Sequence, residues 1–274
     1  MTSAAPLFWR NPALPYVELR QVLDGRNVTY SPHFHNEWSV GAILTGNSEF
    51  VCANRLYTVK RGTLVMMNPH VVHACNPLKH SPWGYYMMHI DTAWLASLLK
   101  KTGIRQYKHW QDTQLDTLSV PSLYLSFVNT CNDLISEAYS TQHKSHKLES
   151  CLTSLVKYVD KNKAEQSTVK PLSNVYKIAQ YLNEHCLDNT SISEISSKFG
   201  LSVGYFNRLF KQSFNMTPHA YRLNCRLHLS QDALKSGETI VDTAHTMGFS
   251  DQAHFQRVFK ERVAATPNQY RRNH

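Results

Sequence analysis

The stretch GFSDQAHFQRVFK, residues 248–260, decides the fold of the C-terminal third of the chain. Gly248 suits a left-handed position that ends one helix and turns the backbone sharply. After it, Phe255, Val258 and Phe259 fall on one stripe of a second helix, and polar residues occupy the opposite face. A short helix, a glycine turn and an amphipathic second helix are typical of a helix-turn-helix, whose second helix lies in the major groove of DNA.

The same pattern occurs earlier in the chain. Each copy has a capping-box-like helix start, a glycine turn and an N-cap for the next helix. These are Ser191-x-x-Glu194, Gly200 and Ser202 in the first copy, and Thr239-x-x-Asp242, Gly248 and Ser250 in the second. The offset between the copies is 48 residues (239 − 191) and becomes 49 after one extra residue, as the pair Arg208 and Arg257 shows. This internal repeat predicts two helix-turn-helix units, at residues 191–214 and 239–262.

The polar faces of the two second helices carry the predicted DNA contacts. Arginine can form two hydrogen bonds with guanine, and asparagine or glutamine can form two with adenine. For base readout we therefore predict Asn207, Arg208, Gln252, Gln256 and Arg257. Lys211 and Lys260 lie nearer the helix ends and are predicted to contact phosphate. For any single charged residue, the alternative is that it merely lies on a solvated helix face. The same residue types recur at matching positions of both helices, which favours double-stranded DNA as the partner. A net charge of +9 agrees with this interpretation.

These motifs resemble the DNA-binding domain of the AraC/XylS family of transcriptional regulators over residues 173–272. The most specific part is residues 248–260, followed by TPNQYRR at residues 266–272. The resemblance implies seven helices, in which a long helix at roughly residues 218–235 bridges the two units. It also implies recognition helices about one turn of DNA apart, ~34 Å. The expected function is sequence-specific promoter binding as an activator or a repressor, with RNA polymerase as a further candidate partner.

Two positions depart from the family's pattern. Ala264 or Ala265 stands where the family often has glycine before Thr-Pro, and Gly204 occupies a position that reads a base in some members. Because glycine has no side chain, the first unit is expected to read fewer bases than the second, or to contact mainly phosphate and DNA shape.

The N-terminal half has a different pattern. Residues 17–90 alternate apolar and polar character in short bursts separated by Gly, Asn and Pro, which predicts a small β-barrel. The resemblance extends less specifically to this half, since many family members carry a cupin-like barrel that binds an effector or mediates dimerisation. The predicted class is therefore α+β. We predict a barrel at residues 1–120, a helical linker or dimerisation region at 121–170 and a DNA-binding domain at 171–274.

A pocket in the barrel mouth is the predicted effector site, because small barrels hold ligands inside and near the rim. Strand alternation gives its candidate wall as His35, Trp38, His73, Cys75 and Tyr85. Glu37 is the alternative to Trp38, and Met87 is the alternative to Tyr85. Such residues suit a sugar, an amino acid or an amine equally well. The alternative is a packed core whose polar atoms are all hydrogen-bonded.

The same region suggests a metal site. His33, His35 and the distant His73 have the arrangement of three ligands in cupin enzymes, and Glu37 is a candidate fourth. Regulatory members of the family commonly keep these histidines without a metal. We therefore predict no metal, no cofactor and no enzymatic activity, and a metal enzyme fused to a DNA-binding domain remains as an alternative. A second alternative is a DNA-binding regulator that needs no ligand.

Residues 122–163 are predicted to be helical, with an apolar stripe of Leu148, Leu152, Leu155 and Val159. The stripe repeats near every 3.5 residues, so it either pairs with a second subunit or covers the barrel. The first is slightly favoured, which predicts a homodimer. The polar residues 160–171 are predicted to be a linker.

Length and composition limit the class of protein. With 274 residues the chain is long enough for two domains, and 42% hydrophobic residues argue against extensive disorder. Its six cysteines are scattered, and no run is apolar and long enough to cross a membrane. We therefore expect a cytoplasmic protein with reduced thiols and no membrane partner.

Overall fold

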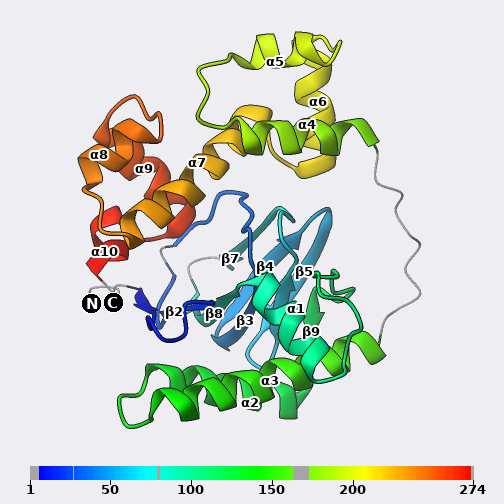
Figure 1. Ribbon diagram of the computed structural model, residues 1–274, viewed down its shortest axis with the longest axis vertical. Coiled ribbons are helices and arrows are strands. Elements are labelled where there is room, and N and C mark those ends of the chain that lie inside the picture. The colour runs from blue at the N-terminus through cyan, green and yellow to red at the C-terminus, as the bar shows by residue number, and fades with distance from the viewer. Residues whose placement is uncertain (1–5, 27, 79–80, 163–172, 273–274) are drawn as a thin grey trace.

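The computed structural model describes residues 6–26, 28–78, 81–162 and 173–272 (Figure 1). In this part of the chain the N-terminal half contains two antiparallel sheets, with strand orders β1-β2-β8-β3-β6-β9 and β5-β4-β7. The strands are β1 (Leu7–Trp9), β2 (Val17–Val22), β3 (Trp38–Thr45), β4 (Asn47–Cys52), β5 (Arg55–Lys60), β6 (Leu64–Met67), β7 (His73–Pro77), β8 (Gly84–Ile90) and β9 (Thr117–Leu118). We call this part the sheet domain.

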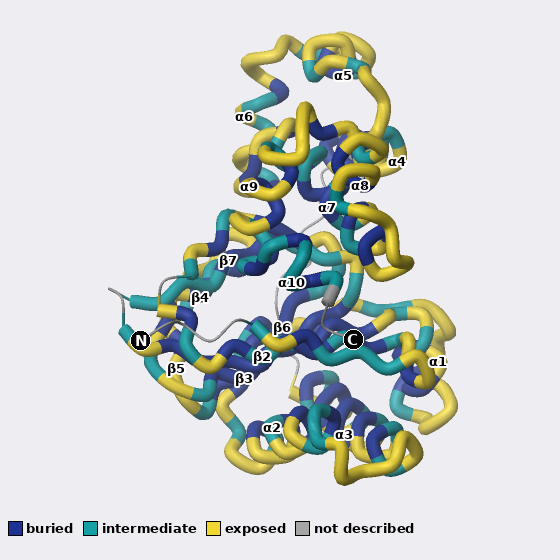
Figure 2. The backbone as a smooth tube through the Cα atoms, turned by 90° about the vertical axis from the view of Figure 1, so that its left-hand side faces the viewer, coloured by how far each residue is buried: buried dark blue, intermediate teal, exposed yellow. Residues whose placement is uncertain are grey.

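The six-stranded sheet is buried on both faces. Along β3, Ile43 faces the three-stranded sheet and packs in one core with Phe50 of β4 and Val59 of β5. Trp38 and Val40 face the opposite side and pack in a second core with the helices. These helices are α1 (Thr92–Lys101), α2 (Pro121–Ile135) and α3 (Thr141–Lys161). In Figure 2, α2 and α3 lie beneath the sheets, with one side of each helix buried and the other exposed.

The stripe on α3 covers the sheet. Leu148, Leu152, Leu155 and Val159 are all almost completely buried in the core beneath the six-stranded sheet. The stripe is therefore unavailable as a seam between two subunits, and the favoured interpretation of these four residues is wrong. The physical reason is that a six-stranded sheet with apolar residues on both faces needs a cover on its second face.

The C-terminal half consists of the seven helices that the resemblance implied. They are α4 (Ser173–Glu184), α5 (Ile192–Lys198), α6 (Val203–Phe214), α7 (Pro218–Lys235), α8 (Ile240–Thr246), α9 (Gln252–Val263) and α10 (Pro267–Arg272). Figure 1 shows α7 running between the unit formed by α5 and α6 and the unit formed by α8 and α9. Residues 163–171 of the predicted linker lie outside the described residues.

The helix ends confirm most of the predicted start and stop signals. The capping box is present, with Glu194 N–H donating to Ser191 Oγ at 3.1 Å and Ser191 N–H donating to Glu194 Oε2 at 2.7 Å. Ser202 caps α6, and Gly200 and Gly248 both have φ near +70°. Left-handed glycines thus end α5 and α8, so the chain turns directly into α6 and α9.

Two details of the second unit differ from the prediction or refine it. The N-cap of α9 is Asp251 and not Ser250, because the Asp251 carboxylate accepts a hydrogen bond from His254 N–H at 2.7 Å. Asp251 lies 49 residues after Ser202 (251 − 202), so the caps follow the later offset of the repeat. Of the two candidate alanines, Ala264 takes the left-handed position, with φ of 52°.

The two halves of the chain share their cores. Phe8 of β1 packs with Phe255, Phe259 and Tyr270 of the second unit. Phe34 packs with the core of the first unit, with its ring centroid 4.6 Å from that of Tyr221 on α7. We call the C-terminal half the helical domain. Across the described part of the chain, no helix is both long and apolar enough to cross a membrane.

Candidate functional site

The recognition helices α6 and α9 separate apolar and polar faces as predicted. Phe206, Phe210, Phe255 and Phe259 are fully buried. Of the seven predicted DNA contacts, the six exposed ones are Arg208, Lys211, Gln252, Gln256, Arg257 and Lys260. The seventh, Asn207, is partly buried, and its Nδ2 donates to the Val203 carbonyl at 3.0 Å. Most of the predicted DNA contacts are therefore free to meet a ligand outside the protein.

The first unit presents a smaller reading surface than the second. Gly204 is the second residue of α6, and a side chain built there would meet no atom within 4 Å. At the aligned position, 49 residues later, α9 carries Ala253, which is exposed. The Asn207 amide already donates a hydrogen bond within its own helix, so Arg208 and Lys211 are the predicted contacts of α6 that are exposed.

A small cavity lies between the two sheets, where four of the five predicted effector residues meet. His35, His73, Cys75 and Tyr85 line it, together with Arg20 and Tyr30. Its volume is only about 30 Å³. That space suits roughly one water molecule, whereas sites for small organic ligands usually have several hundred Å³.

Trp38 lies elsewhere. Its indole is completely buried in the core between the six-stranded sheet and the helices, and Nε1 donates to Thr113 Oγ1 at 3.3 Å. Successive residues of a strand point to opposite faces, so Trp38 cannot share a cavity with residues that face the inner side of β3. Its neighbour Glu37, the stated alternative, lines a different and larger cavity.

The inner cavity is unusually rich in imidazoles. The nearest ligand atoms of His33, His35 and His73 all lie within 4.8 Å of one another. Burial lowers the pKa of His73 to about 4 and holds the pKa values of His33 and His35 well below the ordinary value. Burial also raises the pKa of Cys75 to about 12, so this thiol is protonated at neutral pH. Glu37, the candidate fourth ligand, is not part of the group.

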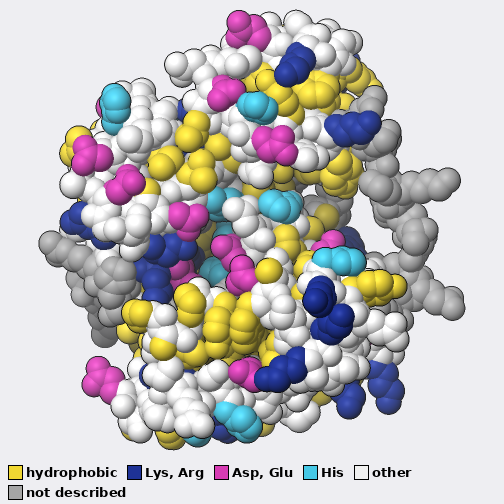
Figure 3. All heavy atoms as spheres, viewed as in Figure 1, with side chains coloured by type: hydrophobic (Ala, Val, Ile, Leu, Met, Phe, Trp, Pro, Cys, Tyr) yellow, Lys and Arg dark blue, Asp and Glu magenta, His cyan; other side chains and the backbone are white. Residues whose placement is uncertain are grey.

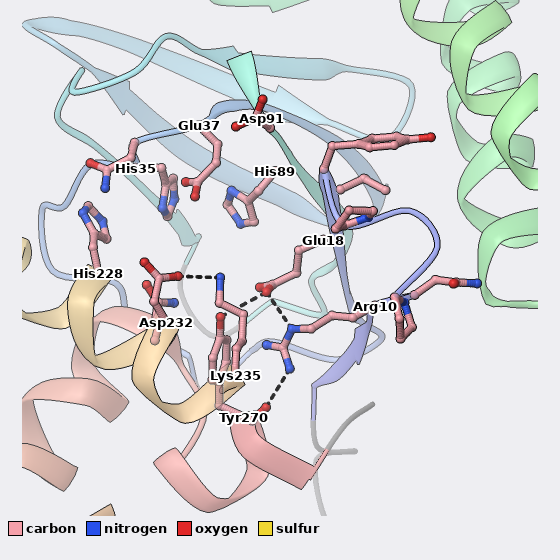
Figure 4. Close-up of a pocket in the computed structure, with 17 residues that line it drawn as sticks. Arg10, Glu18, His35, Glu37, His89, Asp91, His228, Asp232, Lys235 and Tyr270 are labelled. Carbon is pink, nitrogen blue, oxygen red and sulfur yellow. Dashed lines mark hydrogen bonds and ion pairs between the residues drawn. The ribbon is translucent and has the colours of Figure 1, made fainter. Parts of the chain in front are cut away.

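The larger cavity, of about 520 Å³, lies between the sheet domain and the helical domain (Figure 4). The sheet domain contributes His35, Glu37 and His89, and the segment before and along β2 contributes Arg10 and Glu18. The helical domain contributes His228, Asp232 and Lys235 of α7 and Tyr270 of α10. Figure 3 shows acidic, basic and histidine side chains around a hollow at this junction. We call it the interdomain cavity.

Ion pairs join most of its charges. Arg10 Nε lies 2.7 Å from Glu18 Oε2, and Lys235 Nζ lies 2.8 Å from Asp232 Oδ1. Burial by itself would raise the pKa of Glu18, but Arg10, followed by His89 and Lys235, makes the net change a decrease. Burial raises the pKa of Glu37, which forms no ion pair within the described residues. Glu37 is therefore the carboxyl group that a ligand's donor could satisfy.

No sequence pattern predicts this cavity as a whole. Arg10 and Lys235 are 225 residues apart (235 − 10), and neither belongs to a recognisable motif. The cavity exists because Phe8 and Phe34 place the sheet domain against both helix-turn-helix units. Only His35 and the alternative Glu37 were among the residues predicted to line an effector pocket.

Comparisons with known proteins agree across both domains. The family model described as "AraC-like ligand binding domain" matches residues 15–156, and the one described as "Helix-turn-helix domain" matches residues 195–273. The chain is 25% identical over 227 residues to the HTH-type transcriptional regulator YbfI of Bacillus subtilis (strain 168), covering 81% of this chain and 80% of YbfI. It is 23% identical over 253 residues to the HTH-type transcriptional activator RhaS of Citrobacter koseri, covering 88% and 87%.

A solved structure with a similar fold is that of ToxT from Vibrio cholerae with a bound unsaturated fatty acid. The TM-score is 0.57 with 16% sequence identity, and the match covers 99% of this chain and 96% of ToxT. At this identity the likeness shows the fold alone. It extends over both domains, and so supports the joint arrangement of sheets and helices described above.

Proposed function

Because the chain belongs to the AraC family of transcriptional regulators, we propose that α6 and α9 read promoter DNA and that a small molecule in the interdomain cavity controls this reading. The chain is thus a DNA-binding transcriptional regulator with an N-terminal ligand-binding domain. One observation carries the proposal: the interdomain cavity is lined by residues of the ligand-binding domain and by α7, which joins the two DNA-reading units.

The proposed division of roles in DNA binding follows side-chain chemistry. Arg208 and Arg257 would pair with guanine, and Gln252, Gln256 and Asn207 with adenine. Lys211 and Lys260 would neutralise phosphates, because a lysine ammonium is a point charge without a planar face for a base. The exposure of six of these seven side chains supports the proposal. We further propose that the second unit supplies most of the base specificity.

The lining of the interdomain cavity favours a small polar effector. ToxT is described with a fatty acid, whereas this cavity is surrounded by ionisable side chains, which a long apolar chain would leave poorly solvated. Glu37 is largely buried, and the charge of Lys235 offsets only part of the effect of burial on its pKa. Glu37 forms no ion pair among the described residues, so a ligand ammonium or hydroxyl group would satisfy it. We therefore propose an amine, an amino acid or a sugar of a size that fits about 520 Å³.

Control of DNA binding requires the effector to favour one arrangement of the two domains over another. A ligand in the interdomain cavity would touch α7 on one side and Glu37 or His89 on the other. It would therefore bind more tightly to one relative position of the domains. We propose that this position sets the distance and angle between α6 and α9. The first of these helices packs directly against α7, and the second shares a buried core with Leu227 and Leu234 of α7.

The remaining parts of the proposal concern partners. A homodimer would use a surface other than the α3 stripe, because that stripe is buried within the chain. RNA polymerase is proposed as a further partner at the promoter. The matched families are regulatory, so we propose no enzymatic activity. Light scattering of the purified chain at several concentrations tests the oligomeric state.

The test of effector control uses the full chain. Amines, amino acids and sugars are screened by thermal shift, and DNA affinity is then measured with and without each binder on a fragment obtained by in vitro selection. Glu37→Gln should lose the shift, whereas Glu238→Gln, at an exposed position after α7, should keep it. If no binder changes DNA affinity, the ligand-independent alternative replaces this part of the proposal.

A further inference from the structure

Three histidines are held together by the backbone at one end of the space between the sheets. His33 and His73 form an isolated antiparallel bridge, in which His33 N–H donates to His73 O at 3.0 Å and His73 N–H donates to His33 O at 2.8 Å. Their side chains therefore lie on the same face. His35, two residues further on, projects to the same side, and the three ring centroids lie 4.5 to 5.0 Å apart.

Backbone carbonyls orient two of the three rings. His33 Nδ1 lies 2.8 Å from the carbonyl oxygen of Ser31, and His73 Nδ1 lies 2.9 Å from that of Val71. A carbonyl oxygen can only accept, so each Nδ1 carries the proton and each Nε2 keeps its lone pair. This is the outer-shell arrangement that metal-binding histidines have in proteins. Within the described residues no hydrogen bond holds the His35 ring, and the rings of His33, His73 and His89 pack around it with centroids 4.3 to 5.0 Å away.

We propose that His33, His35 and His73 bind one divalent transition-metal ion of the zinc type, and that α7 senses its occupancy through Phe34. Three imidazoles suit zinc, cobalt, nickel or copper, and they disfavour magnesium and calcium, which prefer oxygen ligands. Bonds of about 2.1 Å in a tetrahedral site need nitrogens about 3.4 Å apart, so separations of up to 4.8 Å must close by up to about 1.4 Å. Rotation of the His35 ring, which no hydrogen bond fixes within the described residues, would bring its nitrogen toward those of His33 and His73.

The site has room for a fourth ligand and borders the interdomain cavity. The three imidazoles meet at the small inner cavity, whose volume of about 30 Å³ would hold a metal-bound water. His35 also lines the interdomain cavity, so the ion would lie at the boundary of the two cavities. An open fourth position is typical of sites that exchange a small ligand.

Phe34 connects this site to the helical domain. It lies in sequence between two of the proposed ligands, and its ring is completely buried in the core of the first helix-turn-helix unit. Its carbonyl oxygen accepts hydrogen bonds from Asn224 Nδ2 at 3.0 Å and from His228 Nε2 at 2.8 Å. An ion that fixes His33 and His35 therefore fixes the peptide to which α7 is bonded. The consequence for DNA binding rests on the proposed function, whereas metal binding does not.

The first test is metal binding by the full chain after treatment with a chelator. Titration with Zn²⁺ alone, followed by calorimetry and elemental analysis, should give one equivalent bound at about micromolar strength or tighter. Co²⁺ alone should give the visible absorption of a nitrogen-rich site of low coordination number. His35→Gln should weaken binding by about 100-fold while far-ultraviolet circular dichroism stays unchanged. His73→Ala is the second ligand variant.

The control is His109→Ala, which removes an exposed histidine far from the site in sequence and should leave Zn²⁺ binding unchanged. The chain has 15 histidines, so weak surface binding is the main competitor. Several weak sites that His35→Gln does not affect, or no stoichiometric site at all, would overturn the proposal.

The second test measures whether α7 senses the ion, without any DNA. Hydrogen exchange of the α7 amides should slow by about tenfold or more when the chain is saturated with Zn²⁺. Asn224→Ala removes one donor to Phe34 and should reduce this protection while one equivalent of Zn²⁺ still binds. If one equivalent of Zn²⁺ binds but hydrogen exchange in α7 is unchanged, the metal site is supported and the proposal that α7 senses the ion is overturned. If Zn²⁺ binds and slows exchange in α7 but does not change DNA affinity, the proposed regulation of DNA binding is wrong and the metal site is still supported.

Discussion

The guanidinium group of Arg10 lies 4.1 Å from the ring centroid of Tyr270, and Arg10 Nη1 donates a hydrogen bond to the Tyr270 carbonyl oxygen at 3.0 Å. Both residues also contact the carboxylate of Glu18, Arg10 through Nε at 2.7 Å and Tyr270 through its hydroxyl at 3.0 Å. The first residues of the sheet domain therefore hold the last helix of the chain. The position of α10, and with it the second unit, depends on this three-residue contact.

Removing Arg10 should loosen the junction between the domains. Arg10→Ala leaves the Glu18 carboxylate buried without its main cationic partner, so the unfolding free energy should fall by about 3 kcal/mol. Hydrogen exchange should speed up in α10. Chemical denaturation monitored by tryptophan fluorescence measures the first effect, and mass spectrometry the second.

The matched control is Arg26→Ala, which breaks an exposed ion pair with Asp24 of nearly the same length, 2.8 Å. Solvent screens this pair, so no measurable change in stability is expected. Equal effects of the two substitutions would contradict the importance given to the buried contact.

The imidazole of His228 should make stability depend on pH. Burial lowers the pKa of His228 from 6.5 to about 4, while Nε2 donates to Phe34. Between these pH values the unfolded chain binds a proton that the folded chain does not, so the full stability is present above pH 6.5 and is lost as the pH falls toward 4. Since His228 is partly exposed to the interdomain cavity, its share of the loss is of the order of 2 kcal/mol.

His228→Gln keeps a side-chain donor for Phe34 and removes the titration. Its unfolding free energy should decrease less than that of the natural chain between pH 7 and pH 4, by about the same 2 kcal/mol. The groups that face His228 include His70, Asp232 and Lys235, and they are unchanged in this variant. His109→Gln, at an exposed position, should follow the natural curve. Parallel curves for all three proteins would rule out a contribution of His228 to the pH dependence of stability.

What the sequence could predict depends on whether the signal is local. The capping box at Ser191 and the left-handed Gly200 need only a few neighbouring residues, and both are present in the structure. The position of Trp38 could not be predicted in the same way, because both faces of β3 are buried. Without alternating apolar and polar residues, the sequence does not show which side chains of the strand face the cavity. Likewise, the apolar stripe on α3 could pack against a sheet or against a second subunit. The choice between them depends on the apolar outer face of the six-stranded sheet, which only the structure reveals.

The interdomain cavity shows the same limit more strongly. Its walls combine residues near the N-terminus, on β8, on α7 and on α10, and no local pattern records which of them meet. The group of His33, His35 and His73 was partly predictable. His33 and His35 were recognisable as a pair, but their approach to His73 depends on a backbone bridge between residues 40 positions apart (73 − 33).

Ala264 offers a direct way to stabilise the second unit. It ends α9 in a left-handed conformation with φ of 52°, which costs an L-residue with a Cβ atom about 1 kcal/mol. Ala264→Gly should therefore raise the unfolding free energy by somewhat less than about 1 kcal/mol, because glycine also gains freedom in the unfolded chain. Differential scanning calorimetry measures the shift of the melting temperature.

The first unit supplies the comparison for this substitution. Asn215 ends α6 with φ of 51°, 49 residues before Ala264 (264 − 215). Asparagine tolerates this conformation better than alanine, so Asn215→Gly should gain less than Ala264→Gly. A loss of stability in Ala264→Gly would show that contacts of its methyl group with the sheet domain outweigh the backbone strain.

The two kinds of proposed DNA contact should differ in their dependence on sequence and salt. Arg257 is exposed in the second turn of α9, so Arg257→Ala should cost roughly 1 to 3 kcal/mol on a selected site and relax the preference for one base. Lys260 is exposed in the last turn, and Lys260→Ala should weaken all sequences alike and reduce the salt slope of log K by about one unit. Fluorescence anisotropy on selected and random duplexes at several salt concentrations separates these effects.

Lys101→Ala, at the end of α1 in the sheet domain, controls for the loss of one positive charge and should change neither quantity. Equal losses on selected and random DNA for both Arg257→Ala and Lys260→Ala would overturn the division between base and phosphate contacts, and with it the proposal that the second unit carries most of the specificity.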